Sequence, residues 1–372
     1  MLLGVPKEIK VHEYRVGMTP GSVREVIAHG HKVIVQEGAG AGIGLTDHMY
    51  RTAGAEIVPD AKTVFARADM IVKVKEPQPS ETAMLREGQV LFTYLHLAPD
   101  PEQTHALIKS KCVAIAYETV TDARGGLPLL APMSEVAGRM SIQAGAHCLE
   151  MYQGGRGMLL GGVPGVAAAK VVIIGGGVVG ANAARMAMGL EAHVTVLDKS
   201  LPRLAELDQQ FGAKLNTIFS TLDAIEEHVL GADLVIGAVL VPGASAPKLL
   251  TANMVRHMKP GSVIVDVAID QGGCSETSKA TTHAHPTYVV DNVVHYCVAN
   301  MPGAVARTST FALNNATLPF TLQLADKGYK RACRENPHLK AGLNVHHGRL
   351  TYAAVAEALN LTSISADDAL AG

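Results

Sequence analysis

The 372-residue chain contains no tryptophan, and aromatic residues make up only 4% of it. Its core must therefore be built from aliphatic side chains, which dominate the 48% of residues that are hydrophobic. Parallel strands that are covered by helices on both faces suit this composition. A chain of this length is long for one hydrophobic core, so we expect two domains.

An excess of charge of one sign is also lacking, because 32 Lys and Arg residues stand against 34 Asp and Glu residues. No run of basic residues marks a surface for nucleic acid. No uncharged run reaches the roughly 18 apolar residues that a membrane helix needs. The first residues, MLLGVPKE, lack the apolar stretch of a signal peptide. We therefore expect a cytoplasmic protein without a nucleic-acid or membrane partner.

Cysteine is scarce, and its number is odd. No C-x-x-C pair is present, so the spacing predicts neither a disulfide framework nor a zinc site. No other group of ligands has a recognisable spacing, and we predict no metal. The default expectation is reduced, mostly buried thiols at Cys112, Cys148, Cys274, Cys297 and Cys333.

The most informative stretch is residues 170–198, KVVIIGGGVVGANAARMAMGLEAHVTVLD. It reads as strand, glycine turn, helix, strand and acid, which is the order of a dinucleotide-binding unit. Gly175 allows the tight turn, and Gly177 lets the backbone approach a pyrophosphate. Gly180 lets the helix lie close to the strand, and the N–H groups at the helix start face the anion. The chain is therefore predicted to bind a dinucleotide.

The acid at the end of the second strand narrows the choice of cofactor. Asp198 can accept hydrogen bonds from both ribose hydroxyls and repels a 2′-phosphate, so NAD is favoured over NADP. Lys199 and Arg203 follow closely. These two cations either soften that repulsion or simply lie at a solvated helix start.

Strand and helix patterns alternate before this unit and predict a separate α/β domain. We expect strands at 1–5, 32–36, 70–74, 89–92 and 113–116 and helices at 22–29 and 100–110. After a helical stretch at 134–152, further strands at 234–239, 262–268 and 288–290 complete a doubly wound sheet around the glycine turn. From Arg307 onward we expect helices without strands, packed on the first domain so that a cleft lies between the two domains.

A nicotinamide enzyme must fix the substrate carbon, neutralise a substrate carboxylate and move a proton. Arg15 lies in a loop after the first strand, where its fork would bind a carboxylate or where it is simply a surface arginine. Lys75 follows an apolar strand at the end where α/β clefts open. It would meet a carboxylate or a carbonyl oxygen, or it is a solvated strand end.

Two further residues are candidates for proton transfer. His96 lies just past another strand and titrates near neutral pH, although most of the 16 histidines must be structural or exposed. Asp270 opens a loop on the dinucleotide side, where a carboxylate would activate water or hold an ammonium group. Asp266 lies inside an apolar run and is expected to be a structural acid.

Seven separated segments resemble the alanine dehydrogenase family: MLLGVPKEIK, VKVKEP, YLHLA, LLAPMSEVAGRMS, GGVPGV, VDVAIDQGG and ANMPGAV. The resemblance covers essentially the whole chain. It implies a substrate domain built from both chain ends, 1–128 and 307–372, with a Rossmann-type NAD domain, 129–306, inserted between them. It also implies a homohexamer that oxidises L-alanine with NAD and water, reversibly, to pyruvate, ammonium and NADH.

The resemblance also implies roles for individual residues. Arg15 and Lys75 bind the substrate carboxylate and oxygen, while His96 and Asp270 donate and accept protons. The basic residues at the positions of Arg203 and Lys279 vary between Lys and Arg in the family, and that exchange keeps charge but not fork geometry. With the glycine turn, the expected cofactor-binding set is Ser134, Gly175, Gly177, Val178, Val179, Gly180, Asp198, Arg203, Ser220, Val239, Leu240, Val267, Ala268, Ile269, Asp270, Lys279, Val298, Ala299, Asn300 and Met301.

Three other functions stay open from the sequence. The NAD(H)-binding component of a proton-translocating transhydrogenase shares the two-domain architecture but needs no amino-acid pocket. A lysine- or saccharopine-type dehydrogenase would need polar groups for a longer side chain. A non-catalytic NAD-binding protein would have lost one of the proton-handling residues, and none is missing here.

Overall fold

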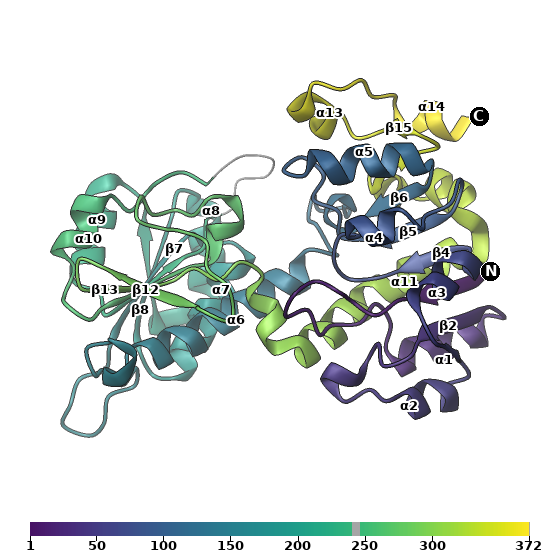
Figure 1. The fold of residues 1–372 in the computed structure, drawn as a ribbon. Helices are drawn as coiled ribbons and strands as arrows, with labels where there is room; N and C mark the ends of the chain where they lie inside the picture. The colour runs from purple at the N-terminus through teal and green to yellow at the C-terminus, as the bar shows by residue number, and fades with distance from the viewer. Residues whose placement is uncertain (240–245, 372) are drawn as a thin grey trace. The chain divides into compact units, whose positions relative to one another are not determined.

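The computed structural model describes residues 1–239 and 246–371. The chain divides into two compact units: unit 1 comprises Met1–Met133 and Val305–Gly372, and unit 2 comprises Ser134–Ala304. Each unit is built around a sheet of its own (Figure 1). The expected domain boundaries, after residues 128 and 306, remain a prediction.

In the described part of unit 1, eight strands form one sheet in the order β15-β14-β6-β5-β4-β1-β2-β3. Six neighbouring strands run parallel, in the order β6, β5, β4, β1, β2 and β3. The strands β14 and β15 are antiparallel and lie at one edge. The strands are β1 (Leu2–Val5), β2 (Lys32–Gln36), β3 (Glu56–Val58), β4 (Met70–Val72), β5 (Val90–Thr93), β6 (Val113–Ala116), β14 (Leu343–His346) and β15 (Arg349–Leu350).

The helices of unit 1 begin where the sequence supplies caps. Thr19 accepts a hydrogen bond from Ser22 N before α1, and Asp100 caps α5, whose first residue is Pro101. The helices are α1 (Pro20–Ala28), α2 (Asp47–Thr52), α3 (Ala61–Arg67), α4 (Pro79–Thr82), α5 (Pro101–Ser110), α11 (Ala306–Glu335), α12 (Pro337–Lys340), α13 (Ala353–Leu359) and α14 (Ala366–Ala371), with short 3-10 turns η1 (Ala41–Ile43) and η2 (Tyr117–Thr119).

The expectation of a strand-free chain after Arg307 is wrong. β14 pairs antiparallel with β6, and a two-residue turn joins it to β15. His347 and Gly348 form that turn with φ of 45° and 84°, as a type I′ hairpin requires. Strands of four and two residues are too short for their alternation to show in a pattern otherwise dominated by helices. β3, β9 (Leu215–Phe219) and β13 (Val293–Tyr296) were not expected either.

In the described part of unit 2, seven strands form the order β12-β13-β11-β10-β7-β8-β9, and only β12 is antiparallel to its neighbour. This is the doubly wound Rossmann order, which confirms the expected fold class. The other strands are β7 (Lys170–Ile174), β8 (His193–Asp198), β9 (Leu215–Phe219), β10 (Leu234–Gly237), β11 (Val263–Asp266) and β12 (Thr287–Val290).

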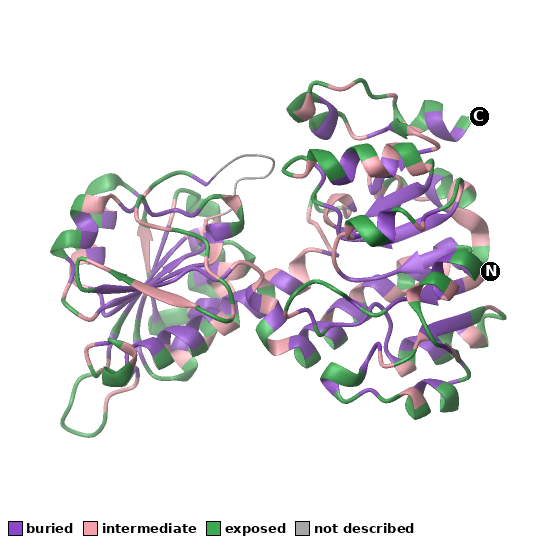
Figure 2. Ribbon diagram, in the orientation of Figure 1, coloured by how far each residue is buried: buried purple, intermediate pink, exposed green. Residues whose placement is uncertain are grey.

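Helices cover both faces of this sheet (Figure 2). Its central strands β7, β10, β11 and β13 are largely buried, whereas the edge strands β9 and β12 are partly exposed. Val171 and Ile173 of β7 pack into one hydrophobic cluster, whereas Val172 and Ile174 pack into another. Alternate residues of one strand thus serve two cores, as expected for a parallel sheet. The helices are α6 (Ala131–Cys148), α7 (Val178–Gly189), α8 (Leu201–Phe211), α9 (Leu222–Leu230) and α10 (Ala252–His257), with η3 (Met151–Gln153), η4 (Gly212–Lys214), η5 (Val267–Gln271) and η6 (Met301–Val305).

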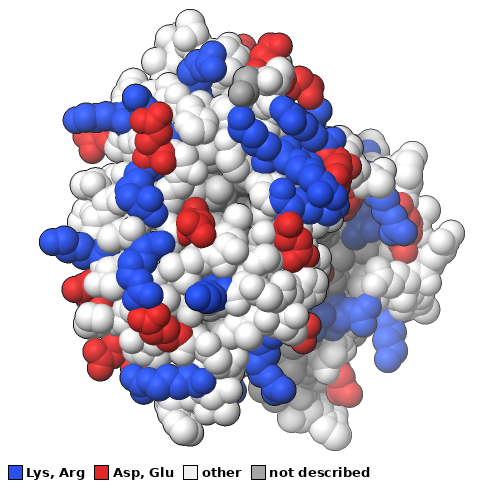
Figure 3. Space-filling view, turned by 90° about the vertical axis from the view of Figure 1, so that its right-hand side faces the viewer, with Lys and Arg blue, Asp and Glu red and all other residues white. Residues whose placement is uncertain are grey.

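The surface agrees with the mixed charge of the sequence. Acidic and basic side chains are interspersed over the face drawn in Figure 3. Within residues 1–239 and 246–371, no helix combines the length and the apolar character needed to cross a membrane. All five cysteines are free and buried, which agrees with the expected buried thiols.

Candidate active site

The three glycines of the predicted turn have three different environments. Gly175 has φ of +102°, and a Cβ there would lie 2.7 Å from the carbonyl oxygen of Ala238. A Cβ on Gly180 would come within 1.8 Å of the carbonyl oxygen of Gly175, so only glycine lets α7 pack here. A Cβ on Gly177 would meet no atom of the described residues within 4 Å. The backbone at Gly177 is therefore open to a ligand.

Helix α7 begins at this opening. Gly177 is its N-cap and makes no side-chain capping bond, and the first helical residue, Val178, is 44% exposed. The N–H groups of a first helical turn lack partners within the helix and attract anions. The turn lies between β7 and β10, where the strand order reverses and where such sheets bind ligands.

Asp198 ends β8 and is held against the glycine turn. Its Oδ2 accepts a hydrogen bond from Gly176 N at 2.6 Å, and its Oδ1 accepts one from Ser200 N at 2.8 Å. A carboxylate accepts about four hydrogen bonds, so lone pairs remain for two hydroxyls. Arg203 donates from Nε to Gly176 O at 2.6 Å and pairs with Glu206. The guanidinium of Arg203 therefore braces the glycine turn rather than lying free in solvent.

The remaining cofactor-binding candidates of unit 2 mostly follow parallel strands. Ser220 follows β9, Val239 follows β10, residues 267–270 follow β11 and residues 298–301 follow β13. The carboxyl ends of parallel strands share one sheet edge, which is also the edge of the glycine turn. Ser134 lies in α6, Lys279 is exposed, and Leu240 lies outside the described residues. The binding role of this set stays a prediction.

Asp266 and Asp270 differ sharply in their surroundings. Asp266 is fully buried and accepts hydrogen bonds from Ala268 N at 3.1 Å, Cys274 N at 2.8 Å and Ser278 Oγ at 2.5 Å. It is a structural acid, as expected, and it ends β11 earlier than expected by capping η5. Asp270 lies within η5 and is exposed. Of the two, only Asp270 is accessible to a substrate.

Sequence reasoning missed the side chain that holds the turn after Asp270. The Nζ of Lys248 donates hydrogen bonds to the carbonyl oxygens of Gly272 at 2.5 Å, Gly273 at 2.9 Å and Ser275 at 3.1 Å. No local pattern around Lys248 signals this contact, because it joins segments more than 20 residues apart. The ammonium group fixes the backbone that leaves η5.

Arg15 is buried in unit 1, so it is not a surface arginine. Its Nε donates to Glu13 Oε1 at 2.7 Å and its Nη2 to Glu13 Oε2 at 2.6 Å, while Nη1 lies 3.1 Å from the sulfur of Met133. Burial by itself would lower the pKa of Arg15, but the hydrogen bonds that Arg15 donates to Glu13 and the charge of Glu13 outweigh burial and raise the pKa. The guanidinium is therefore a fixed, permanently charged group.

Lys75 lies beyond the end of β4 and is partly buried. Its Nζ is 3.5 Å from Glu76 Oε2, and Lys10 pairs with the same carboxylate. Burial raises the pKa of Glu76, but the charge of Lys75 and the pairing with Lys10 outweigh it and lower the pKa to about 2. Glu76 thus stays ionised and keeps a negative charge beside Lys75.

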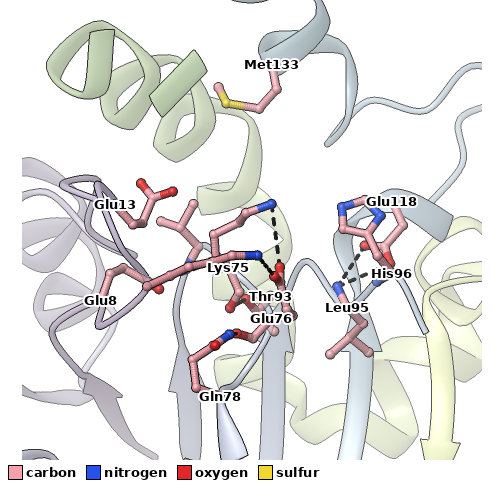
Figure 4. Close-up of polar contacts among 12 residues, drawn as sticks. Glu8, Glu13, Lys75, Glu76, Gln78, Thr93, Leu95, His96, Glu118 and Met133 are labelled. Atoms are coloured by element: carbon pink, nitrogen blue, oxygen red, sulfur yellow. Dashed lines mark hydrogen bonds and ion pairs between the residues drawn. The ribbon is translucent and has the colours of Figure 1, made fainter. Parts of the chain in front are cut away.

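His96 follows β5 and is exposed, with a left-handed backbone at φ of 50°. The backbone N–H of His96 donates a hydrogen bond to Glu118 Oε1 at 2.6 Å, and the same carboxylate accepts one from the backbone N–H of Leu95 (Figure 4). The imidazole stacks on the ring of Tyr94, with centroids 5.8 Å apart. Glu118 fixes the strained backbone, and Tyr94 orients a ring that can still exchange protons with solvent.

Three of the predicted residues share one edge of the sheet of unit 1. Arg15 is in the loop after β1, Lys75 follows β4 and His96 follows β5, and these strands are consecutive neighbours in the sheet. Figure 4 shows Lys75 and His96 at the ends of adjacent strands. Four acids that support these residues were not predicted: Glu8, Glu13, Glu76 and Glu118.

Two family models match the chain. "Alanine dehydrogenase/PNT, N-terminal domain" matches residues 4–137, and "Alanine dehydrogenase/PNT, C-terminal domain" matches residues 141–353. The alanine dehydrogenase of Halomonas elongata is 63% identical over 366 residues, which cover 98% of this chain and 99% of that protein. The alanine dehydrogenase of Bacillus subtilis is 56% identical over 371 residues, covering 100% of this chain and 98% of the other.

Solved structures agree with these matches. A structure of L-alanine dehydrogenase superposes with a TM-score of 0.94 at 53% identity, covering 97% of this chain and 99% of the other. The transhydrogenase structure from Sinorhizobium meliloti gives a TM-score of 0.82 at 26% identity, covering 94% and 100%. Sequence and fold therefore agree over nearly the full length of both chains.

Proposed function

The chain belongs to the alanine dehydrogenase/PNT family, and from that membership we propose that it is an NAD-dependent L-alanine dehydrogenase. It converts L-alanine, NAD and water reversibly to pyruvate, ammonium and NADH. The full-length identity of 63% to a named alanine dehydrogenase carries this proposal most strongly. The cations and proton carriers of the candidate site support it independently.

The described residues fit NAD. The open position at Gly177 and the uncapped start of α7 suit a pyrophosphate, and Asp198 suits a ribose with free 2′- and 3′-hydroxyls. When bound, NAD supplies an acceptor for the hydride that leaves the substrate α-carbon. The Nε of Arg203 donates a hydrogen bond to the carbonyl oxygen of Gly176, so the guanidinium helps to hold the glycine turn in place.

Arg15 and Lys75 hold the substrate by its carboxylate and, in pyruvate, by the carbonyl oxygen. Glu13 occupies Nε and one hydrogen of Nη2, so the plane of the guanidinium is fixed before substrate arrives. A fixed cation lowers the entropy lost when a carboxylate is bound. Lys75 adds a positive charge at the neighbouring strand end, and its ammonium group is paired with the carboxylate of Glu76.

His96 and Asp270 handle the protons. Loss of hydride leaves an iminium carbon, and water must add to it before ammonium departs. Asp270 stabilises the positive charge and accepts a proton from the attacking water. His96 exchanges the proton on the oxygen that becomes the carbonyl of pyruvate. Both side chains are exposed, so their protons can equilibrate with solvent.

The rival functions are separated by an assay. The NAD(H)-binding component of a transhydrogenase needs none of the substrate groups, and the transhydrogenase structure is only 26% identical to this chain. We expect NADH to form when the protein is mixed with L-alanine and NAD, and a much lower rate with NADP. A larger amino acid as the best substrate would favour a lysine- or saccharopine-type enzyme. Absence of turnover with every amino acid would leave only a nucleotide-binding protein.

We further propose that the protein is cytoplasmic and that it is a homohexamer, the second as the family resemblance implies. Light scattering on the purified protein measures the mass of the assembly directly. A mass of about six chains is expected, and a monomer or dimer would contradict the proposal. No nucleic acid or membrane takes part in the proposed reaction, whose partners are L-alanine, pyruvate and ammonium.

A further inference from the structure

A buried cluster of charge lies beneath the candidate substrate residues of unit 1. Lys73 is fully buried, and its Nζ lies 2.9 Å from Glu8 Oε2 and 3.3 Å from Glu81 Oε2. Burying an ion pair adds little net stability, because desolvation offsets the attraction. The proposed reaction uses none of these three residues directly. Their value must therefore be sought in what they hold in place.

The cluster holds the backbone of Lys75 from two sides. Glu8 Oε1 accepts hydrogen bonds from Val74 N at 2.7 Å and from Lys75 N at 3.4 Å. The Nζ of Lys73 donates to Lys75 O at 3.1 Å, and the hydroxyl of Thr93 donates to the same oxygen at 2.9 Å. The chain has already left β4 at this point, so buried side chains fix the direction in which Lys75 leaves the strand.

The same cluster is joined to the loop that carries Arg15. Glu8 belongs to that loop, and its ion pair with Lys73 ties the loop to the end of β4. Gly17 adds a second tie, because a Cβ there would lie 2.3 Å from Val72 O and 2.9 Å from Lys73 Cα. The loop after β1 therefore contacts the chain after β4 both through backbone and through a buried ion pair.

We propose that the Glu8–Lys73 ion pair is a positioning element that sets the spacing between Arg15 and Lys75, and with it the affinity for the carboxylate of a small 2-oxo or 2-amino acid. This inference rests on the proposed function, because it assigns the ion pair to the carboxylate-binding cations. Neither Glu8 nor Lys73 touches the substrate. Both act through the backbone of Lys75 and the loop of Arg15.

Glu8→Gln is the sharpest test. The amide keeps the size of the side chain and one acceptor for Val74 N, but it loses the charge-assisted contact to Lys73. Lys73 remains balanced by Glu81, so no buried cation is left unpaired. Burial raises the pKa of Glu8, although the charge of Lys73 opposes this effect.

The expected result is a change in substrate affinity with little change in cofactor affinity. We expect the KM for pyruvate to rise about tenfold, the effect of weakening one charge-assisted contact, while kcat and the Kd for NADH change by less than about twofold. Calorimetric titration of pyruvate into the enzyme–NAD complex should show the same loss without turnover. Thr93→Val removes one donor to Lys75 O, keeps the shape of the residue, and should raise the KM by a smaller factor.

A matched control separates positioning from stability. Gln89 is also buried in unit 1, and its amide donates to the carbonyl oxygens of Phe65 and Ala68 at the opposite end of β5. Gln89→Met should lower the unfolding temperature without changing the KM for pyruvate. Circular dichroism melts of all three variants report whether each one is folded.

Each outcome has one meaning. If the wild-type protein does not oxidise L-alanine, the proposed function fails. If the wild-type protein is active and folded Glu8→Gln keeps the wild-type KM and pyruvate Kd, the positioning role is overturned. The positioning role is also overturned if Glu8→Gln and Gln89→Met change the KM equally. If Glu8→Gln does not fold, an unchanged KM in Thr93→Val overturns it.

Discussion

Glu13 and Arg15 form a two-pronged ion pair in which both side chains are almost completely buried, at 0% and 2% exposure. The pair was not expected from the sequence, which by itself favoured a surface arginine at position 15. An arginine fork bound to a carboxylate in parallel hydrogen bonds has a fixed orientation. The cation proposed to bind substrate is therefore held rigidly by an acid two residues away in the same loop.

Glu13→Gln should weaken both folding and substrate binding. The amide retains at most one acceptor toward the guanidinium and removes the negative charge beside a buried cation. Breaking a buried ion pair in this way costs about 3 kcal/mol of unfolding free energy. We expect this loss in chemical denaturation, with a higher KM for pyruvate in the folded variant.

A matched control for Glu13→Gln is Glu56→Gln, because Glu56 makes the same two-pronged contact with Arg67 at 2.6 and 2.8 Å but on the surface. Solvent screens exposed pairs, so this control should change neither stability nor KM measurably. Equal effects in the two variants would show that burial of Arg15 is unimportant.

The glycine turn gives a second prediction, because alanine substitutions at two of its glycines should have different effects. Gly177 has φ of −63° and open space at its Cβ, so Gly177→Ala should fold normally but place a methyl group where the pyrophosphate approaches. NADH affinity should fall by about tenfold or more, as for a lost ligand contact of ordinary strength. Fluorescence titration with NADH measures it.

Gly180→Ala should instead damage folding, because its Cβ would overlap the carbonyl oxygen of Gly175 at 1.8 Å. A lower unfolding temperature for this variant, beside an unchanged one for Gly177→Ala, is the expected pair of results. An unchanged NADH affinity in Gly177→Ala would contradict pyrophosphate binding at this turn.

The sequence predicted most strongly what local chemistry determines. The strand, turn and acid of the dinucleotide unit, and the strand ends that carry Lys75 and His96, are all local patterns, and the structure has them. Contacts between distant segments were not predictable in the same way. Lys73 looked like one more strand residue, yet it pairs with Glu8 some 65 positions earlier in the chain. The hairpin of β14 and β15 was missed because each strand is too short for its pattern to outweigh the helices around it.

The pH dependence of folding gives a third prediction, at His346. Burial, aided by the charges of His347, Lys330 and Arg349, lowers the pKa of His346 to about 4 from its usual 6.5. Between pH 6.5 and 4 the unfolded chain therefore binds a proton that the folded chain does not. The resulting stability is fully present above pH 6.5 and is lost progressively as the pH falls from about 6.5 to about 4. The pKa difference corresponds to roughly 3 kcal/mol, which partial solvation of the ring reduces to about 2 kcal/mol.

His346→Gln removes this titration and should flatten the fall in unfolding free energy between pH 6.5 and 4. His48→Gln, which changes an exposed histidine, should leave the slope as it is in the wild-type protein. Denaturant unfolding at a series of pH values gives the slopes directly. Parallel curves for the wild-type protein and His346→Gln would rule out the buried neutral imidazole.

Asp270 provides the most direct test of the proposed chemistry. Its carboxylate is exposed on η5, while Asp266 nearby is engaged by four backbone or hydroxyl donors and cannot serve as a proton acceptor without disrupting the turn. Asp270→Asn keeps the shape of the side chain but removes its charge and basicity. Loss of a positioned general base lowers turnover by about 10²- to 10⁴-fold. NADH binding should remain close to that of the wild-type protein, because the glycine turn and Asp198 are unchanged.

Asp223→Asn is the control for Asp270→Asn, since Asp223 is an exposed acid in the first turn of α9 and lies in the same unit. It should retain full turnover. If Asp270→Asn also retains most of its turnover, the proton acceptor for water must be another group, and the proposed role of Asp270 is wrong. If NADH binding is lost together with turnover, Asp270 contributes to cofactor binding before it contributes to proton transfer, and its rate effect no longer reports on chemistry.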